Sequence, residues 1–166
     1  MRSWRVGQTR FVINSDISRA AAGDAHYEPL YVRVIAPERP EEREPTADEL
    51  RVRAVQGDVE AQTGWAHKLL DGVEVPRDLA AAYRWFSIAA GHGNADALNM
   101  VGRCHENGWH VSADTREAAR WYRQAADKGH AWGAFNLGCL LAQGRGVSAD
   151  PKAALRYLVQ AARGGN

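Results

Sequence analysis

The 166-residue sequence contains little cysteine, no long apolar run and almost no net charge. Cys104 and Cys139 are its only two cysteines, which excludes a disulfide scaffold. No stretch approaches the roughly 20 apolar residues of a membrane span, and the start, MRSWRVGQTRF, lacks the apolar run of a signal peptide. A net charge of +1 gives no support for a nucleic-acid binder. We therefore expect a cytoplasmic protein with free thiols that binds neither membrane nor nucleic acid.

The patterns of common catalytic and metal sites are also missing. No nucleophile, base and acid stand together as a set. The segment GRGVSAD (144–150) is not followed by the GK[ST] of a phosphate loop. Zinc-ligand spacing is absent from the histidines and cysteines of the second half, which are Cys104, His105, His110, His130 and Cys139. We therefore expect no catalysis, no cofactor and no metal.

A period of 36 residues is the dominant feature that the sequence does contain. Shifting the chain by this period aligns eight columns of similar residues without a gap. One glycine column consists of Gly57, Gly93, Gly129 and Gly165. Further columns are Gly72, Gly108 and Gly144; Val75, Val111 and Val147; Asp78, Asp114 and Asp150; Ala54, Ala90, Ala126 and Ala162; and Ala82, Ala118 and Ala154. Such agreement does not arise by chance.

The columns predict two helices in each repeat. Asp78, Asp114 and Asp150 each begin an alanine-rich stretch, where a side-chain oxygen caps helical N–H groups. Gly72, Gly108 and Gly144 close the preceding helix, where a left-handed residue is favoured. The first helices, called A, are expected near 58–71, 94–107 and 130–143. The second helices, called B, are expected near 78–91, 114–128 and 150–163.

Two further columns concern packing between these helices. The small residues Ala66, Gly102 and Gly138 allow helices to approach closely. The aromatic residues Trp85, Trp121 and Tyr157 are expected to lie largely buried between the helices of a repeat. In front of the first repeat, Thr46 and Glu49 have capping-box spacing, which predicts a lone helix of the B type.

Residues 97–129 (ALNMVGRCHENGWHVSADTREAARWYRQAADKG) and 133–165 resemble the Sel-one-like repeat (SLR) family, relatives of the tetratricopeptide repeats. Repeat one departs from the family pattern, because Ala66 stands at the helix A glycine and Glu74 at a loop glycine. In repeat two, His110 replaces that loop glycine. The resemblance implies an all-α fold, a right-handed α/α superhelix of three repeats (near 58–93, 94–129 and 130–165) behind a leading helix. It also implies a bacterial adaptor or scaffold rather than an enzyme.

The first 45 residues do not repeat. Residues 4–14 and 31–35 are β-like, and residues 15–24 could form a helical turn or two. Residues 37–60 carry eight acidic residues against four arginines, and within them 37–45 form a proline-bearing linker. We expect an N-terminal extension (1–45) that packs as a hairpin or strand pair on the first helices or on a partner, followed by a repeat domain (46–166).

Repeat arrays of this kind bind through the concave face that their A helices line. Analogy with the tetratricopeptide pattern places seven candidate partner-binding residues on that face: Trp132, Phe135, Cys139, Arg103, Glu106, Asn99 and His67. The aromatic pair in repeat three suggests a contact hot spot, unless the N-terminal extension covers it. The first two repeats contribute polar residues of mixed charge.

These observations leave two functional hypotheses. The first is a non-catalytic adaptor or accessory subunit that binds another protein, such as an enzyme, through its concave face, its N-terminal extension or both. The alternative is a subunit that contributes to an enzyme active site shared with a partner. The last B helix also has Leu155, Tyr157, Leu158 and Val159 with no following repeat to cover them all, so we expect some apolar surface there that self-association or a partner could cover.

Overall fold

The computed structural model describes residues 2–6, 9–13, 32–35 and 43–164. The chain divides into two compact units, residues 1–44 and residues 45–166. In the part of the chain that is described, no helix has the length and apolar character needed to cross a membrane.

The N-terminal unit contains a small antiparallel sheet. Its strands are β1 (Arg2–Val6), β2 (Thr9–Ile13) and β3 (Val32–Ile35), in the order β1-β2-β3. Trp4 pairs with Phe11 across the first two strands, and Phe11 pairs with Val34 across the next two. The predicted β segment 4–14 therefore folds back on itself, and the sheet has three strands rather than two. The expected helical turns at 15–24 and most of the linker lie outside the described residues.

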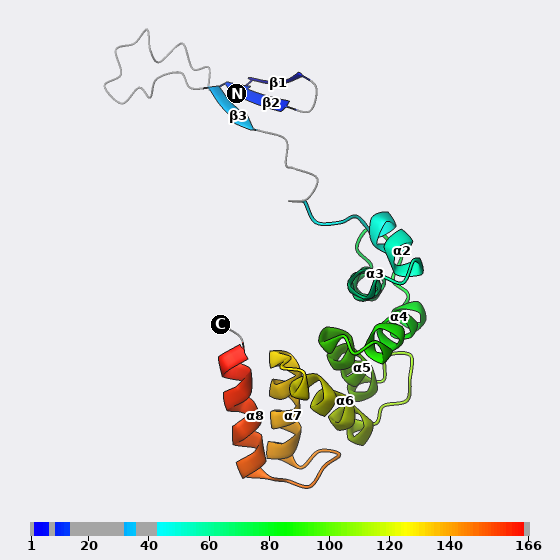
Figure 1. Cartoon of the computed structure of the whole chain (residues 1–166), viewed down its shortest axis with the longest axis vertical. Helices are drawn as coiled ribbons and strands as arrows, with labels where there is room; N and C mark the ends of the chain where they lie inside the picture. The colour runs from blue at the N-terminus through cyan, green and yellow to red at the C-terminus, as the bar shows by residue number, and fades with distance from the viewer. Residues whose placement is uncertain (1, 7–8, 14–31, 36–42, 165–166) are drawn as a thin grey trace, which may run out of the picture. The chain divides into compact units, whose positions relative to one another are not determined.

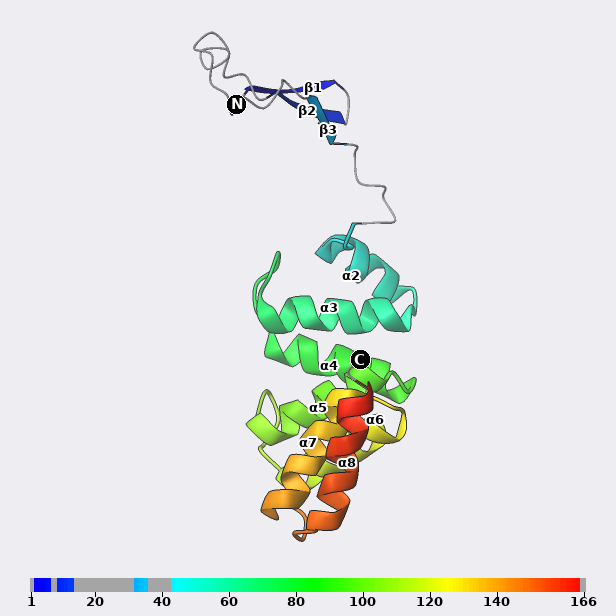
Figure 2. The same cartoon turned by 90° about the vertical axis from the view of Figure 1, so that its left-hand side faces the viewer.

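The second unit is all-helical. It consists of α2 (Ala47–Val55), α3 (Val59–Asp71), α4 (Leu79–Gly91), α5 (Ala95–Asn107), α6 (Thr115–Asp127), α7 (Ala131–Gln143) and α8 (Pro151–Gly164). Each helix packs on its neighbours in the sequence, so the helices follow one another in a curved stack (Figures 1 and 2). The A helices are α3, α5 and α7, and the B helices are α4, α6 and α8. This arrangement is the superhelix expected from the repeat.

The predicted capping residues determine where these helices begin and end. The side chain of Asp78 accepts a hydrogen bond from the backbone of Ala81, and Asp114 caps α6 in the same way. The A helices end at glycines with left-handed φ angles, 73° at Gly72, 70° at Gly108 and 65° at Gly144. The capping box of Thr46 and Glu49 is present at the start of α2. Local sequence signals therefore predicted the helix boundaries closely.

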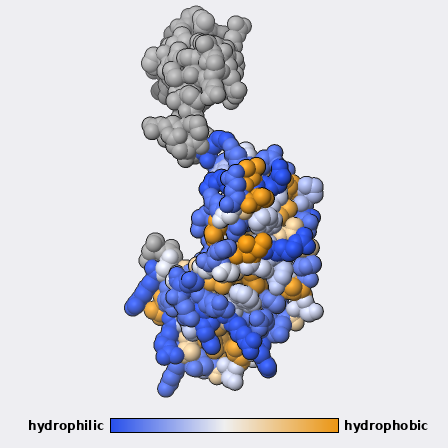
Figure 3. Space-filling view, turned by 45° about the vertical axis from the view of Figure 1, so that its right-hand side comes forward, coloured by the Kyte–Doolittle hydropathy of each residue, from blue (hydrophilic) through white to orange (hydrophobic). Residues whose placement is uncertain are grey.

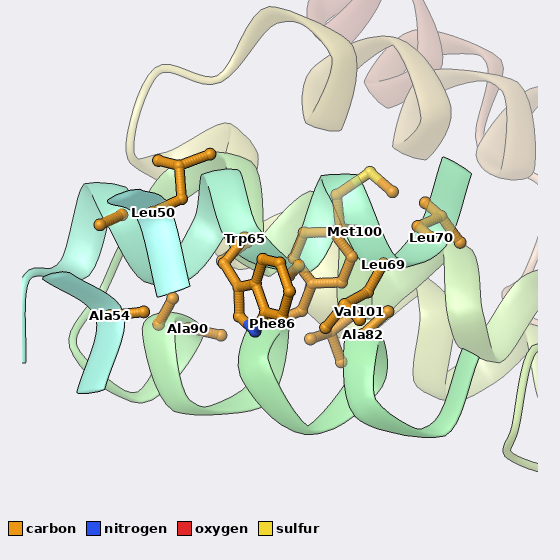
Figure 4. Close-up of a cluster of buried hydrophobic side chains, with 14 of the residues drawn as sticks. Leu50, Ala54, Trp65, Leu69, Leu70, Ala82, Phe86, Ala90, Met100 and Val101 are labelled. Carbon is orange, nitrogen blue, oxygen red and sulfur yellow. The ribbon is translucent and has the colours of Figure 1, made fainter. Parts of the chain in front are cut away.

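The core runs between the A and B helices, but its aromatic centre lies one position away from the predicted column. Phe86 and Tyr122 have no exposed surface. Trp85 and Trp121 are only partly buried and pack against the edge of the same core. One residue along a helix turns a side chain by about 100°, so the inner face takes the neighbour of each tryptophan. Figure 4 shows Phe86 among Trp65, Met100 and Val101 in this core.

The small-residue column permits the close contacts that were predicted for it. A Cβ atom on Gly102 would lie 2.7 Å from the ring of Tyr122, and one on Gly138 would lie 2.9 Å from Leu158. Tyr122 is held in place by its hydroxyl, which donates a hydrogen bond to Glu106 at 2.7 Å. The two helices of repeat two therefore meet at a contact where a side chain on Gly102 would force the Tyr122 ring to move.

On the face drawn in Figure 3, hydrophobic and hydrophilic residues are interspersed over the helices. Of the larger exposed apolar side chains, Val52, Val55, Val73 and Ile88 are distributed over α2, the loop after α3 and α4. The other four lie on the last repeat, Trp132 and Phe135 on α7 and Leu155 and Val159 on α8. Single exposed apolar residues need no special explanation, whereas such a group marks a surface for interaction.

Candidate functional site

A polar hollow of about 400 Å³ crosses the three A helices. Its lining comes from every repeat: His67 on α3, Asp96, Asn99, Met100 and Arg103 on α5, and Trp132 and Asn136 on α7. Four of the seven sequence-predicted residues meet here, namely His67, Asn99, Arg103 and Trp132. We call this surface the polar hollow.

The carboxylate of Asp96, which lines the polar hollow, lies between two imidazoles, one of them on a residue outside the lining. Oδ2 of Asp96 is 2.7 Å from Nε2 of His67, and Oδ1 is 3.6 Å from Nε2 of His130. His130 is also the N-cap of α7, because its Nδ1 accepts a hydrogen bond from the backbone N–H of Gly133 at 3.1 Å. Since Nδ1 is an acceptor, the ring proton is on Nε2 and faces Asp96. The cluster therefore ties together side chains from all three repeats.

The electrostatics of this cluster favour an ionised Asp96. Partial burial raises the pKa of its carboxyl, but the imidazoles of His130 and His67 lower it by more. The net effect holds the pKa of Asp96 well below its ordinary value. A negative charge is therefore held in the lining of the polar hollow, beside the two histidines.

Asn99 and Asn136 form the second polar contact between repeats. Nδ2 of Asn136 donates a hydrogen bond to Oδ1 of Asn99 at 3.0 Å, and Asn99 is only 4% exposed. Asn136 was not predicted as a site residue. The available signal was its position four residues after Trp132, which places both side chains on the same face of α7. This pair orients two amides at the floor of the polar hollow.

Arg103 supplies the cation of the polar hollow. Its guanidinium lies 5.2 Å from the ring centroid of Trp109, and its Nη1 is 3.8 Å from the sulfur of Met100. The side chain is exposed, and the ion pairs found within the described residues do not include it. A guanidinium in this state can pair with an acidic group of a ligand.

Glu106 lies outside the polar hollow, although the sequence placed it on the same face. Its Oε2 accepts the hydrogen bond from Tyr122, and its Oε1 is 3.4 Å from Nη1 of Arg145. Burial raises the pKa of the Tyr122 hydroxyl, and the carboxylate of Glu106 raises it further. Glu106 is therefore engaged in holding repeat two to the loop before α8.

Trp132 and Phe135 border a second, apolar hollow of about 550 Å³ between α7 and α8. Trp132 lines both hollows, whereas Phe135 lines only the apolar one, together with Leu158, Ala161 and Ala162. Cys139 is half-buried and lines neither. The aromatic pair and the polar residues thus face two adjoining surfaces, where the sequence predicted a single groove.

The lining of the polar hollow combines several kinds of polar group with one aromatic side chain. It offers imidazole, carboxylate, amide and guanidinium groups beside an indole wall, and no serine, threonine or cysteine nucleophile is among its lining residues. The described residues also contain no group of three or more histidine, cysteine, aspartate or glutamate side chains suited to a metal ion. Hydrogen-bonding groups beside an aromatic wall are the usual composition of a peptide-binding surface.

Comparisons with known proteins agree with this fold. The chain matches the model of the Sel1 repeat at residues 59–94, 95–130 and 133–166. A Sel1 repeat protein from Oxalobacter formigenes is 32% identical, with a TM-score of 0.68, over 72% of this chain and 49% of that one. No curated protein sequence matches the chain.

Two further solved structures have the same fold. A protective antigen of uropathogenic Escherichia coli with an SLR fold is 31% identical, with a TM-score of 0.70, over 74% of this chain and 26% of that one. Cysteine rich protein B of Helicobacter pylori is 25% identical, with a TM-score of 0.59, over 74% of this chain and 92% of that one. The chain thus spans about half or less of the length of the first two. Three matching repeats and this fold together show that the chain belongs to the Sel1 repeat family.

Proposed function

We propose that this chain is a non-catalytic adaptor that binds a segment of another protein across the polar hollow. Sel1 repeat proteins generally mediate protein–protein interactions. The observation that carries the proposal for this chain is that all three A helices contribute hydrogen-bonding side chains to one hollow, next to the exposed indole of Trp132. An extended peptide could pair its backbone with the half-buried amide of Asn136, which buried Asn99 orients and which carries both donors and an acceptor.

Each side chain in the polar hollow has a distinct role in this proposal. Trp132 is the apolar anchor, since it is 66% exposed and lies at the edge of the polar surface. Phe135 supports it edge to face. Arg103 binds an acidic group of the partner, whereas Asp96, together with His67, binds a hydrogen-bond donor of the partner. Aromatic anchors carry most interface energy, and charges at the rim mainly affect association rate and salt dependence.

Photo-crosslinking tests where the partner lies. A photoreactive amino acid placed at Arg103, inside the polar hollow, should crosslink the partner in a lysate of the source organism. The same amino acid at Val55, which is 72% exposed on α2, serves as the matched control. Crosslinking from position 55 alone would place the partner on another surface and end the proposal for the polar hollow.

A second candidate is a subunit that contributes to an active site shared with a partner. It is favoured by the 2.7 Å contact between His67 and Asp96, since a carboxylate that orients an imidazole is one component of general-base catalysis. The two functions differ in what His67→Ala does to a purified complex at saturating substrate. If the chain is an adaptor, we expect the turnover of the complex to be unchanged by His67→Ala once the complex is fully formed. If the chain shares an active site, we expect His67→Ala to abolish turnover while the complex remains assembled.

We also propose a division of the chain into two parts and a cellular compartment for the protein. The boundary of the two compact units, between Glu44 and Pro45, supports an extension of residues 1–45 and a repeat domain of residues 46–166. We place the protein in the cytoplasm, which cell fractionation would test. We also propose that the chain acts in a heteromeric complex, with a homo-oligomer through α8 as the alternative, and sedimentation measurements on the purified chain would distinguish the two.

A further inference from the structure

The three A helices begin with different N-cap residues at equivalent positions of the repeat. Asp58 on α3 and Asn94 on α5 each accept, through a side-chain oxygen, a hydrogen bond from the backbone N–H three residues on, at 3.1 and 2.9 Å. His130 on α7 accepts the corresponding bond from Gly133 at 3.1 Å through Nδ1 of its ring. The helix that carries the aromatic pair is therefore capped by an imidazole, which is not among the groups preferred at this position.

An imidazole differs from the other two caps in its response to pH. The amide of Asn94 does not titrate, and a backbone hydrogen bond together with the Arg53 side chain holds the pKa of Asp58 below its ordinary range. Both therefore remain acceptors between about pH 8 and about pH 5, the range in which histidine titrates. In His130 the added proton goes to Nδ1, because Nε2 already carries one. Protonated Nδ1 is a donor and cannot accept the N–H of Gly133.

Helix α7 has little else to hold its first turn. Gly133, a weak helix former, stands at the capped position because a Cβ there would lie 2.6 Å from the Cβ of Ala125 on α6. The first turn contains no acidic residue to interact with the helix dipole, whereas the first turns of α3 and α5 contain Glu60 and Asp96. A positive charge on His130 is itself unfavourable at a helix N-terminus. Protonation should therefore loosen this turn.

The charged groups around His130 do not replace the lost cap. Its one ion pair found within the described residues is with Asp96 of α5, whose other oxygen contacts His67 of α3. The neutral ring already makes this contact through Nε2, so protonation strengthens it without restoring the bond to Gly133. Helix α7 itself carries no charged residue. Other charged groups on the elements packed beside His130 are Glu60, which is bonded to Asn94, Arg103, which lies against Trp109, and the exposed Asp127, Lys128 and Arg163.

The aromatic anchor of the polar hollow lies inside this turn. Trp132 stands between His130 and Gly133, the two residues that the cap joins. Its ring is 66% exposed and meets Phe135 edge to face. Because so much of the ring lies in solvent, its position depends largely on the backbone of the first turn.

We propose that His130 makes the anchor of the polar hollow sensitive to pH: its protonated ring releases the N-cap of α7, and the turn that carries Trp132 loosens. Partner affinity is therefore highest at neutral to slightly alkaline pH and falls on acidification. The effect on affinity rests on the proposed function of the polar hollow, whereas the loss of the cap does not.

NMR spectroscopy of the full chain, without a partner, tests the cap itself. At about pH 8 the His130 ring should carry its proton on Nε2, with Nδ1 unprotonated. As the pH falls to about 5, the amide resonance of Gly133 should move with the titration of the ring. In protein labelled with fluorotryptophan, the fluorine resonance of Trp132, assigned with Trp132→Phe, should shift or broaden over the same titration.

Three variants identify the group responsible. His130→Asn restores at α7 the cap that Asn94 provides at α5, and it cannot titrate, so both resonances should lose their pH response. Asp96→Asn should retain the response, because the cap and not the ion pair takes up the proton. His92→Asn, at the exposed C-cap of α4, removes a histidine elsewhere and should behave like wild type.

The protein recovered by crosslinking from position 103 then tests the effect on binding. Its own titration cancels when wild type and His130→Asn are compared at the same pH. We expect similar affinities at about pH 8, and binding by wild type that is at least about threefold weaker than by His130→Asn at about pH 5.5.

Several outcomes would overturn the inference. Resonances of Gly133 and Trp132 that do not respond to pH would end it, whatever the partner does. A response that persists in His130→Asn would come from His67 instead, and one that Asp96→Asn abolishes would come from the ion pair. If both resonances respond as expected while the affinity ratio does not change with pH, the partner does not anchor on Trp132, which contradicts the proposed function rather than the cap.

Discussion

The rings of Trp132 and Phe135 meet edge to face on α7 with their centroids 5.7 Å apart, while 66% and 42% of their surfaces remain exposed. At the same positions of repeat two stand Asp96 and Asn99, both of which make polar contacts to neighbouring A helices. The repeat has therefore kept its backbone and exchanged polar contacts between repeats for exposed aromatic surface. Such surface beside the polar hollow makes repeat three the expected anchor for a partner.

Arg103→Ala should weaken partner binding less than loss of the aromatic anchor. Its guanidinium is exposed and rests on Trp109, so its attraction to an acidic group acts largely through solvent. We expect a loss of several-fold in affinity, mainly through slower association, that shrinks as the salt concentration rises. Surface plasmon resonance at low and high salt measures both rates. A loss that does not depend on salt would show that Arg103 acts by packing rather than by charge.

Gly102→Ala should destabilise the protein by roughly 1–3 kcal/mol, the usual cost of overpacking a core. The added methyl would lie 2.7 Å from the Tyr122 ring, which cannot move freely because its hydroxyl is bonded to Glu106. Gly91→Ala is the matched control, since nothing lies within 4 Å of a Cβ there. It should be neutral or slightly stabilising, because alanine favours helix. Urea denaturation that gives equal free energies of unfolding for both variants would contradict this packing.

Sequence reasoning predicted the helices well because their boundaries depend on local signals. Caps such as Asp78 and the left-handed Gly72 act within a few residues and recur with the period. It was less successful with contacts between side chains on different helices. The pairing of Asn136 with Asn99 depends on how successive repeats are rotated. The engagement of Glu106 by Tyr122 depends on how the two helices of repeat two pack, and a period specifies neither arrangement. The tryptophan column was expected to be largely buried, but Trp85 and Trp121 are only partly buried against the core, because the next residue of each helix, Phe86 or Tyr122, takes the fully buried position.

Asp96→Asn should reveal a pH dependence of stability. The folded-state pKa of Asp96 is depressed below the ordinary value of 3.8, chiefly by the imidazoles that outweigh its burial. A depressed carboxyl pKa stabilises the folded state above the unfolded-state value, and this contribution is lost as the pH falls through the folded-state pKa. The difference in Tm between wild type and Asp96→Asn should therefore narrow as the pH is lowered from about 5 to about 2.

Differential scanning calorimetry across this pH range measures that difference. Asp127→Asn provides a control on the exposed side of α6, and its Tm relative to wild type should change little over the same range. If the difference in Tm between wild type and Asp96→Asn stays constant down to the lowest pH, the histidines do not hold the Asp96 carboxylate in its charged form.

The two thiols should differ in reactivity. Cys104 is 2% exposed, and burial raises its pKa to about 11. Since the thiolate is the reactive form, Cys104 should resist iodoacetamide in the native protein, whereas half-buried Cys139 should react. Mass spectrometry after labelling, with and without denaturant, distinguishes the two sites. Rapid native labelling of Cys104 would show that the core of repeat two opens readily.

Binding of a partner protein across the polar hollow, with its anchor on repeat three, is tested most directly by calorimetry. The purified partner is titrated into wild type, Trp132→Ala and the control Val55→Ala. Truncating an aromatic anchor typically costs about 2 kcal/mol or more, which corresponds to roughly a 30-fold loss of affinity. We predict this loss for Trp132→Ala with an unchanged melting temperature, and wild-type affinity for Val55→Ala. A folded Trp132→Ala protein that binds the partner as tightly as wild type would contradict the account.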